Sequence, residues 1–463
     1  MGPGLRGQLN PAAHAAHNRG GNMKRSTTVG SRGSRLVAAL MAGSLIVAAC
    51  GGDDGGGSEP AATEAPADSA APADSSAPAD SSAPADEAGP PTGPEMVIGM
   101  VNTEGTPGLD FPDIRRFAEA SFDYMNTSGG FGNRPVKLET CIAKGSPETS
   151  QACAQELVGK GVELVILGLD LFPDYKTYEA AGVPVIGVLP ILAGDYTANA
   201  LFLTGGNSTS MAAAAAYAKE FLNAKSVGIV SADNPGANGT AASLEAALDK
   251  AGIAHTIVKG GDNETDAGYQ GLMREAAKDN PDVLISLYSD AGCIGTMRGR
   301  ATLGITIPVI TTNICADKDV IDQVGDDASG WIFIGVPEDR ETPERALIRK
   351  IVAPIMGIPE DEIDAASLGL GGLGLILTLS LRDYTIKMVE AGTEVTGQSL
   401  YDFLKTTKSG LFLYGGETPI ECGGSASYPA VCSFVFPMAE YKGDGKVGPI
   451  DGVGLVDSKP YLP

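Results

Sequence analysis

Six of the seven cysteines in the chain fall into three near pairs, a spacing that can serve either disulfide or metal chemistry. The pairs are Cys141 and Cys153, Cys293 and Cys315, and Cys422 and Cys432. Six cysteines allow 15 connectivities, so the spacing favours local pairing without proving it. Zinc is disfavoured, because the chain has no Cys-x-x-Cys motif and His255 is the only histidine after residue 17. We therefore expect three disulfides and no metal ion.

The seventh cysteine, Cys50, directly follows an apolar run that ends in small residues. Residues 36–49 read LVAALMAGSLIVAA, without a charge, and basic residues precede them. This order predicts a secretory signal peptide over residues 1–49. Fourteen helical residues span about 21 Å, less than a hydrocarbon core of roughly 30 Å, so we do not expect a permanent membrane span. Met23 begins an MKR segment, and we interpret residues 1–22 as a candidate start-codon artefact.

The residues around Cys50 resemble the processing site of bacterial lipoproteins. That resemblance implies a diacylglycerol group on the Cys50 sulfur and attachment to the extracytoplasmic face of the cell membrane. The alternative is a secreted soluble protein in which this cysteine has no special role.

Residues 50–95 have the composition of a disordered tether. They lack aromatic residues, and Ala-Pro-Ala-Asp recurs every six residues from position 65 to position 83. Such a segment cannot bury enough apolar surface to offset its chain entropy. Residues 1–49 hold six of the 33 basic residues and no acidic one, so the rest of the chain carries a net charge of −30. This charge argues against nucleic acid as a partner.

The remaining residues, 96–463, alternate short apolar runs with amphipathic segments. Runs such as MVIGMVN (96–102), VELVILG (162–168), SVGIVSAD (226–233) and PDVLISLYS (281–289) have the length and β-branched content of buried parallel strands. Helical patterns separate them. The chain therefore predicts an α/β fold with two doubly wound, mainly parallel sheets in series.

With these elements in this order, the chain resembles a known family, the type I periplasmic solute-binding proteins of the branched-chain amino acid class, which serve ABC importers. The segments that carry the resemblance are NTSGGFGNRPVKLET (126–140), CAQELVGKGVELVILG (153–168), SVGIVSADNPGANG (226–239) and DASGWIFIGVPED (327–339), in this order. The resemblance implies two Rossmann-like lobes joined by three hinge crossovers. Lobe 1 would comprise residues 96–205 plus 338–432, and lobe 2 residues 208–335 plus 433–463.

Ligands of open α/β sheets bind at the carboxyl ends of the strands, so we expect binding residues just after strands. The expected ligand-binding residues are Asn102, Glu104, Asp170 and Leu171 in lobe 1, and Asn234, Tyr288, Asp290 and Asn313 in lobe 2. For Asp170 and Asp290 the alternative role is a helix N-cap. For Tyr288 the alternative is a surface aromatic residue.

The segment 168–172 has no hydroxyl, and Asn313 stands where the family's amino acid binders commonly have an acid for the ligand ammonium. These departures argue against a plain leucine ligand. Cationic or polyhydroxylated ligands would suit Asp170 and Asp290 instead.

Other motifs give no catalytic site. GLGGLG (369–374) matches a nucleotide-binding pattern but lies within a helical pattern, where close helix packing explains it better. DNETDAG (262–268) is too short for a calcium loop. A Ser-His-Asp triad would have to use His255, which is predicted to lie on a strand, and there is no G-x-S-x-G motif.

The resemblance thus implies a monomeric, lipid-anchored substrate-binding subunit of an ABC importer. It would use no cofactor and deliver a small solute to a permease. A ligand sensor on the same scaffold is the alternative, and a tethered hydrolase is less favoured.

Overall fold

The computed structural model describes residues 89–463, apart from 107–109, 337–340, 365–367, 409–410 and 414–415. All of these belong to one compact unit, Asp80–Pro463. The expected signal peptide, Cys50 and most of the expected tether therefore lie outside the described residues. The last part of that expected tether, residues 89–95, is described and bonds to the folded body, because the Gly89 carbonyl accepts from Gly129 and the Gly93 amide donates to Asn133.

The first sheet has five parallel strands in the order β2-β1-β3-β4-β5. The strands are β1 (Met96–Thr103), β2 (Val136–Ala143), β3 (Leu164–Leu167), β4 (Val185–Gly187) and β5 (Leu201–Phe202). The helices between them are α1 (Pro112–Thr127), α2 (Pro147–Gly159) and α3 (Tyr175–Ala181). Ser146 starts α2 with a capping box, which satisfies amide groups that the helix itself leaves free.

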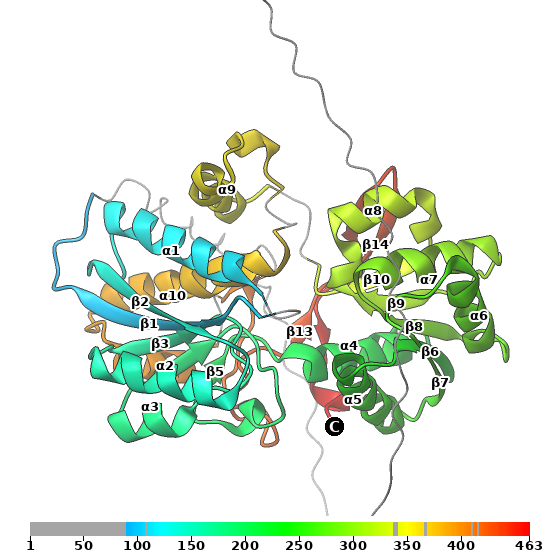
Figure 1. The fold of residues 1–463 in the computed structure, drawn as a ribbon, viewed down its shortest axis with the longest axis horizontal. Helices are drawn as coiled ribbons and strands as arrows, with labels where there is room; N and C mark the ends of the chain where they lie inside the picture. Colours follow the sequence, from blue (N-terminus) through cyan, green and yellow to red (C-terminus); the bar gives the residue numbers. More distant parts are fainter. Residues whose placement is uncertain (1–88, 107–109, 337–340, 365–367, 409–410, 414–415) are drawn as a thin grey trace, which may run out of the picture. The chain divides into compact units, whose positions relative to one another are not determined.

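Both faces of the first sheet are buried under helices (Figure 1). On one face, Ile98, Met100 and Ile166 share an apolar cluster with residues of α1, α9 (Pro343–Met356), α10 (Gly372–Glu390) and α11 (Gly397–Thr406). The other face packs Val101, Val165 and Leu167 against α2 and α3. Successive side chains of a strand point to opposite faces of the sheet. Because both faces are buried here, these strands are apolar on both sides.

The GLGGLG segment lies where α1 and α10 approach each other. A Cβ atom on Gly374 would stand 2.1 Å from the carbonyl oxygen of Ile114. The segment begins with the short 3-10 helix η6 (Gly369–Gly371) and continues into α10 without a preceding strand. The expectation of close helix packing is confirmed.

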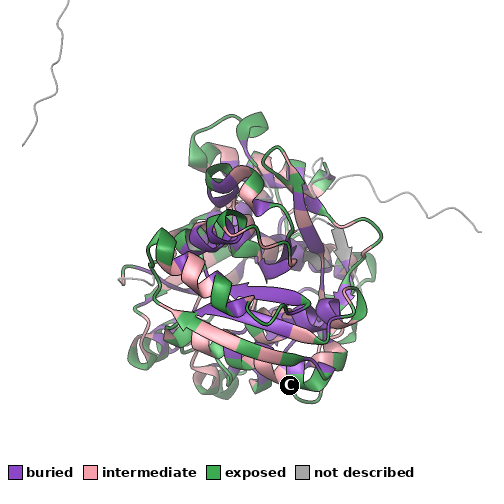
Figure 2. Ribbon diagram, turned by 90° about the vertical axis from the view of Figure 1, so that its right-hand side faces the viewer, coloured by how far each residue is buried: buried purple, intermediate pink, exposed green. Residues whose placement is uncertain are grey.

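The second sheet has seven strands in the order β15-β14-β10-β9-β8-β6-β7. Its parallel part comprises β6 (Ser226–Ala232), β7 (Ala254–Gly260), β8 (Val283–Leu287), β9 (Val309–Thr312) and β10 (Trp331–Ile334). Two antiparallel strands, β14 (Met438–Gly443) and β15 (Lys446–Pro449), extend it from β10. The central strand β8 is buried throughout, whereas the edge strand β7 is partly exposed (Figure 2).

Helices also cover both faces of the second sheet. The helices α4 (Gly206–Glu220) and α5 (Pro235–Ala251) pack on one face, with Ile229, Ile285 and Ile310. On the other face lie α6 (Asp266–Ala276), α7 (Asp290–Thr302) and α8 (Lys318–Val324). Trp331, the only tryptophan of the chain, is fully buried on that second face. The prediction of two doubly wound, mainly parallel sheets is confirmed.

Two small two-stranded sheets complete the described strands. They pair β11 (Leu411–Leu413) with β12 (Gly416–Thr418), and β13 (Val435–Phe436) with β16 (Val456–Asp457). The apolar run around Phe436 is divided between β13 and β14. Pro437 separates them, and a proline cannot donate a ladder hydrogen bond.

Three disulfides join the cysteines that are nearest in sequence, Cys141–Cys153, Cys293–Cys315 and Cys422–Cys432. This is the local pairing that the spacing favoured. In the described part of the chain, no helix has the length and apolarity needed to cross a membrane.

Candidate ligand-binding site

A cavity of about 400 Å³ opens at the carboxyl edge of the second sheet. The segments that follow β6, β7, β8 and β9 line it, together with the first turns of α4, α5 and α7. Its lining residues are Asn207, Ala232, Asn234, Gly236, Ala237, Thr240, Asp262, Asn263, Leu287, Tyr288, Ser289, Ala291, Thr312 and Ile314. The cavity thus lies where parallel α/β sheets bind their ligands.

Asn234, one of the expected ligand-binding residues, lines the cavity, and both halves of its amide are engaged. Its side-chain oxygen accepts the Ala237 amide at 2.8 Å, which caps α5. Its nitrogen donates to Asp262 Oδ1 at 2.5 Å. Because the cap fixes the amide orientation, Asn234 also fixes the position of the Asp262 carboxylate.

Tyr288 forms part of the cavity wall but is only 3 % exposed, which excludes a surface aromatic. Its ring meets Tyr269 edge to face, with centroids 5.5 Å apart. Its hydroxyl is buried and has no hydrogen-bond partner among the described residues. Burial raises the pKa of the Tyr288 hydroxyl, and Tyr269, Glu264 and Asp262 raise it further.

The Cys293–Cys315 disulfide packs against the backbone of Tyr288, behind this wall of the cavity. It joins the first turn of α7 to the 3-10 helix η3 (Asn313–Ala316), which follows β9. Both sulfur atoms lie 3.5 Å from the carbonyl oxygen of Tyr288, and both cysteines are fully buried. The crosslink therefore holds two walls of the cavity together, one containing Ser289 and one containing Ile314.

Two other expected residues of this sheet lie beside the cavity. Asn313 is exposed and stands between the lining residues Thr312 and Ile314, but does not itself line the cavity. Asp290 is the first residue of α7, and the N-cap is Ser289, so the alternative N-cap role of Asp290 is wrong.

The sequence did not single out Asn207, Thr240, Asp262 or Ile314. Asp262 follows the edge strand β7 by two residues, and this position after a strand is the signal that could have identified it.

At the carboxyl edge of the first sheet, Asn102 and Glu104 form an internal polar network. Asn102 Nδ2 donates to Glu104 Oε1 at 3.1 Å and to the Phe111 carbonyl at 2.8 Å. Arg115 binds both carboxylate oxygens of Glu104, at 2.7 and 3.1 Å. Burial alone would raise the pKa of Glu104, but the hydrogen bonds from Arg115 and Asn102 outweigh it and lower that pKa. In this structure both expected residues brace the end of β1.

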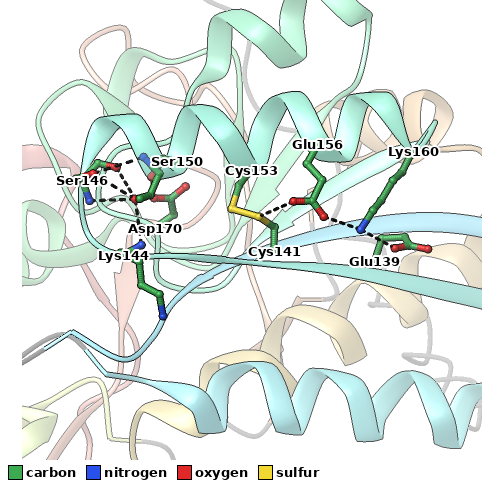
Figure 3. Close-up of a disulfide and its surroundings, with 10 residues drawn as sticks. Glu139, Cys141, Lys144, Ser146, Ser150, Cys153, Glu156, Lys160 and Asp170 are labelled. Carbon is green, nitrogen blue, oxygen red and sulfur yellow. Dashed lines mark hydrogen bonds and ion pairs between the residues drawn. A yellow bond between two sulfur atoms is a disulfide. The ribbon is translucent and has the colours of Figure 1, made fainter.

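Asp170 is 3 % exposed and sits after β3 (Figure 3). Its Oδ1 accepts the Ser150 hydroxyl at 2.6 Å and the Phe172 amide at 3.1 Å. Burial raises its pKa. Asp174, not Asp170, caps α3, so the alternative N-cap role of Asp170 is wrong as well.

The same edge of the first sheet presents apolar side chains. Phe172 follows β3 and is 36 % exposed, while Leu192 follows β4 and is 42 % exposed. Leu171, an expected ligand residue, is half-buried between Asp170 and Phe172.

The described residues contain no group of three His, Cys, Asp or Glu side chains that could hold a metal ion. The cavity combines amide and hydroxyl groups, one carboxylate and an apolar wall. These groups can hold a small organic molecule by hydrogen bonds and apolar contact.

The two doubly wound sheets, with a cavity at the carboxyl edge of one of them, define the type I periplasmic binding protein fold. A family model described as periplasmic binding protein matches residues 95–369, more than half of the chain, and the chain belongs to that family. Its family is thus one of periplasmic binding proteins, which are extracytoplasmic.

Solved structures share this fold. An ABC transporter substrate-binding protein from Sphaerobacter thermophilus is 18 % identical, with a TM-score of 0.61 over 80 % of this chain and 99 % of that chain. A leucine-binding protein from Thermotoga maritima is 13 % identical, with a TM-score of 0.53 over 78 % and 99 %. A solute-binding protein from R. palustris in complex with benzoate is 15 % identical, with a TM-score of 0.53 over 78 % and 96 %. No curated protein matches the chain.

Proposed function

We propose that this protein is the lipid-anchored substrate-binding subunit of an ABC importer. It captures a small solute outside the cytoplasm and delivers it to a membrane permease. The observation that carries the proposal is the cavity of about 400 Å³ at the carboxyl edge of the second sheet, in a chain of the periplasmic binding protein family.

We place the lobes at residues 96–205 plus 338–432 and at 208–335 plus 433–463. Binding between two lobes works by population shift, because a ligand favours the closed form only as far as it binds that form more tightly. The permease then recognises the closed form. The proposed ligand class is an amino acid, amide or similar solute; two structural neighbours are named for other small solutes, leucine and benzoate.

Ligand capture is tested by thermal denaturation of the full-length protein in detergent with amino acids, amides, short-chain acids, polyamines and sugars. A ligand at 100 times its Kd stabilises the folded protein by about 2.7 kcal/mol. At least one solute should raise the melting temperature. If none does, solute capture is contradicted.

The anchor and the transport role are tested in cells. Intact protein should carry a diacylglycerol on Cys50 by mass spectrometry and sediment with membranes, and Cys50→Ser should be released. Uptake of the solute identified by thermal denaturation should require the protein. Binding without any effect on uptake would contradict the importer role and favour a ligand sensor.

A further inference from the structure

We propose that the cavity selects solutes with an amine or amide nitrogen on an apolar body, and that it rejects carboxylates. This inference rests on the proposed function and specifies its ligand class. Asp262 is the residue that makes the selection.

The charge of the cavity wall favours nitrogen donors over carboxylates. Among the described lining side chains, Asp262 holds the only formal charge at neutral pH, and none is basic. A carboxylate ligand would lose its hydration beside Asp262 without gaining a cationic partner, which is unfavourable. An ammonium or an amide N–H would find an acceptor there, and a hydrogen bond to a charged group is stronger than one between neutral groups.

The position of Asp262 supports the same preference. Asn234 holds Oδ1 of the carboxylate and is itself fixed by the cap of α5. The other carboxylate oxygen has no hydrogen bond or ion pair with the described residues. Asp262 is thus an oriented acceptor at the cavity wall with capacity for one further donor.

The neighbouring charges do not neutralise Asp262. Lys259, near the end of β7, donates to Asn238 Oδ1 at 2.6 Å, and Asn238 donates in turn to Asp233 Oδ1 at 3.1 Å. Lys259 does not line the cavity. Glu264 lies on the same segment as Asp262, where its carboxylate accepts the Gly261 amide. The potential at this end of the cavity is therefore negative.

Helix N-termini do not reverse this preference. They favour anions, and α4, α5 and α7 all begin at the cavity. At α4, the Ser208 amide already donates to a tyrosine hydroxyl. The N-terminus of α5 is already occupied by the Asn234 side chain. At α7, the amides of Gly292 and Cys293 bond to the Ser289 carbonyl. The described first turns would therefore stabilise a bound anion less than a basic side chain would.

Apolar side chains at the cavity and at the first sheet suit an apolar ligand body. Within the cavity wall, Leu287, Ala232 and Ala237 are apolar, and Ile314 is 45 % exposed. At the carboxyl edge of the first sheet, segments 168–172 and 189–192 contain no hydroxyl and expose Phe172 and Leu192. Each edge can therefore contact an apolar body, and neither segment offers the hydroxyl donors that suit a carboxylate.

The test uses ligands that share one body and differ in charge. Leucinamide, 4-methylpentanamide and 4-methylpentanoate share an isobutyl group, and benzylamine, benzamide and benzoate share a phenyl ring. Calorimetric titration of the full-length protein at pH 6.5 keeps the amines protonated. In at least one set the amine should bind at least about tenfold more tightly than the carboxylate.

Substitution of Asp262 links this preference to one residue. Asp262→Asn keeps an acceptor for Asn234 but removes the charge. It should weaken amine binding at least about tenfold and change amide binding less than about twofold. The matched control is Asp279→Asn, which removes the same charge from an exposed position before β8, at the opposite end of the strands.

The outcomes separate this inference from the proposed function. Tighter binding of a carboxylate, or amine binding that Asp262→Asn leaves unchanged, overturns the inference while solute capture stands. If all six compounds fail to bind, the inference is overturned as well. The proposal of solute capture is contradicted only if no solute of the wider panel raises the melting temperature either.

Discussion

Removal of the Cys293–Cys315 disulfide should lower both the stability of the second sheet and the affinity of its cavity. The crosslink closes a loop of 22 residues. In the chain-entropy description, opening such a loop costs about 3.4 kcal/mol at 25 °C. The double substitution Cys293→Ala with Cys315→Ala should therefore reduce the free energy of unfolding by about 3 to 5 kcal/mol, since packing of two buried sulfurs is also lost.

Trp331 provides the assay, because it is the only tryptophan and is fully buried in the same apolar cluster as both cysteines. Its fluorescence during urea denaturation reports the loss of the packed surroundings of Trp331 in this sheet. The midpoint should fall in the double variant. An unchanged midpoint and slope would refute the argument that this crosslink stabilises the sheet.

The matched control is Cys141→Ala with Cys153→Ala in the first sheet. That disulfide closes a loop of 12 residues, worth about 2.8 kcal/mol by the same relation. Its removal should cost similar stability. This disulfide lies far from Tyr288 in the chain, and its cysteines pack in a different apolar cluster. Leucinamide binding should weaken at least about threefold only when Cys293–Cys315 is removed. Equal effects of both variants on affinity would show that the wall under Tyr288 needs no crosslink.

Two further substitutions test single side chains. Burial raises the folded-state pKa of Asp170 above 3.8, so its ionised form opposes folding; Asp170→Asn should be more stable than wild type at pH 7, and this advantage should shrink as the pH falls toward 4. Thermal denaturation across this pH range measures it, and a variant that is less stable at pH 7 would contradict it. Tyr288→Phe removes a buried hydroxyl without a described partner, so stability should be unchanged or up to about 1 kcal/mol higher, with leucinamide affinity unchanged. A loss above about 1 kcal/mol in urea denaturation would reveal a hydrogen bond to that hydroxyl.

The strands were predictable because their burial on both faces leaves a signal in the sequence. WIFI is a continuous apolar run and VLISL is apolar except for Ser286, and the structure buries every residue of β8 and β10. The close packing of α1 against α10 was predictable from the glycines before and within α10. Local disulfide pairing was favoured, though not proved, by the short spacing within each cysteine pair. In each case the information lies within a short stretch of chain.

The functional side chains were less predictable, because their roles depend on partners elsewhere. Glu104 follows a strand at the expected edge, but Arg115 from α1 binds both of its carboxylate oxygens. Asp170 likewise depends on Ser150 from α2. The role proposed for Asp262 depends in the same way on Asn234, 28 positions earlier, which donates to its carboxylate. No local pattern in the sequence encodes such pairs.

The most direct test of solute capture fills the cavity. Gly236 lines the cavity in the first turn of α5, and an added Cβ there would meet nothing closer than Asn234 Oδ1 at 3.4 Å. Gly239 lies on the same helix outside the cavity lining, with open space around an added Cβ. We would titrate leucinamide and the best ligand from thermal denaturation into wild type, Gly236→Trp and Gly239→Trp. The account predicts that binding persists in Gly239→Trp and is lost in Gly236→Trp. Equal binding in all three proteins would contradict it.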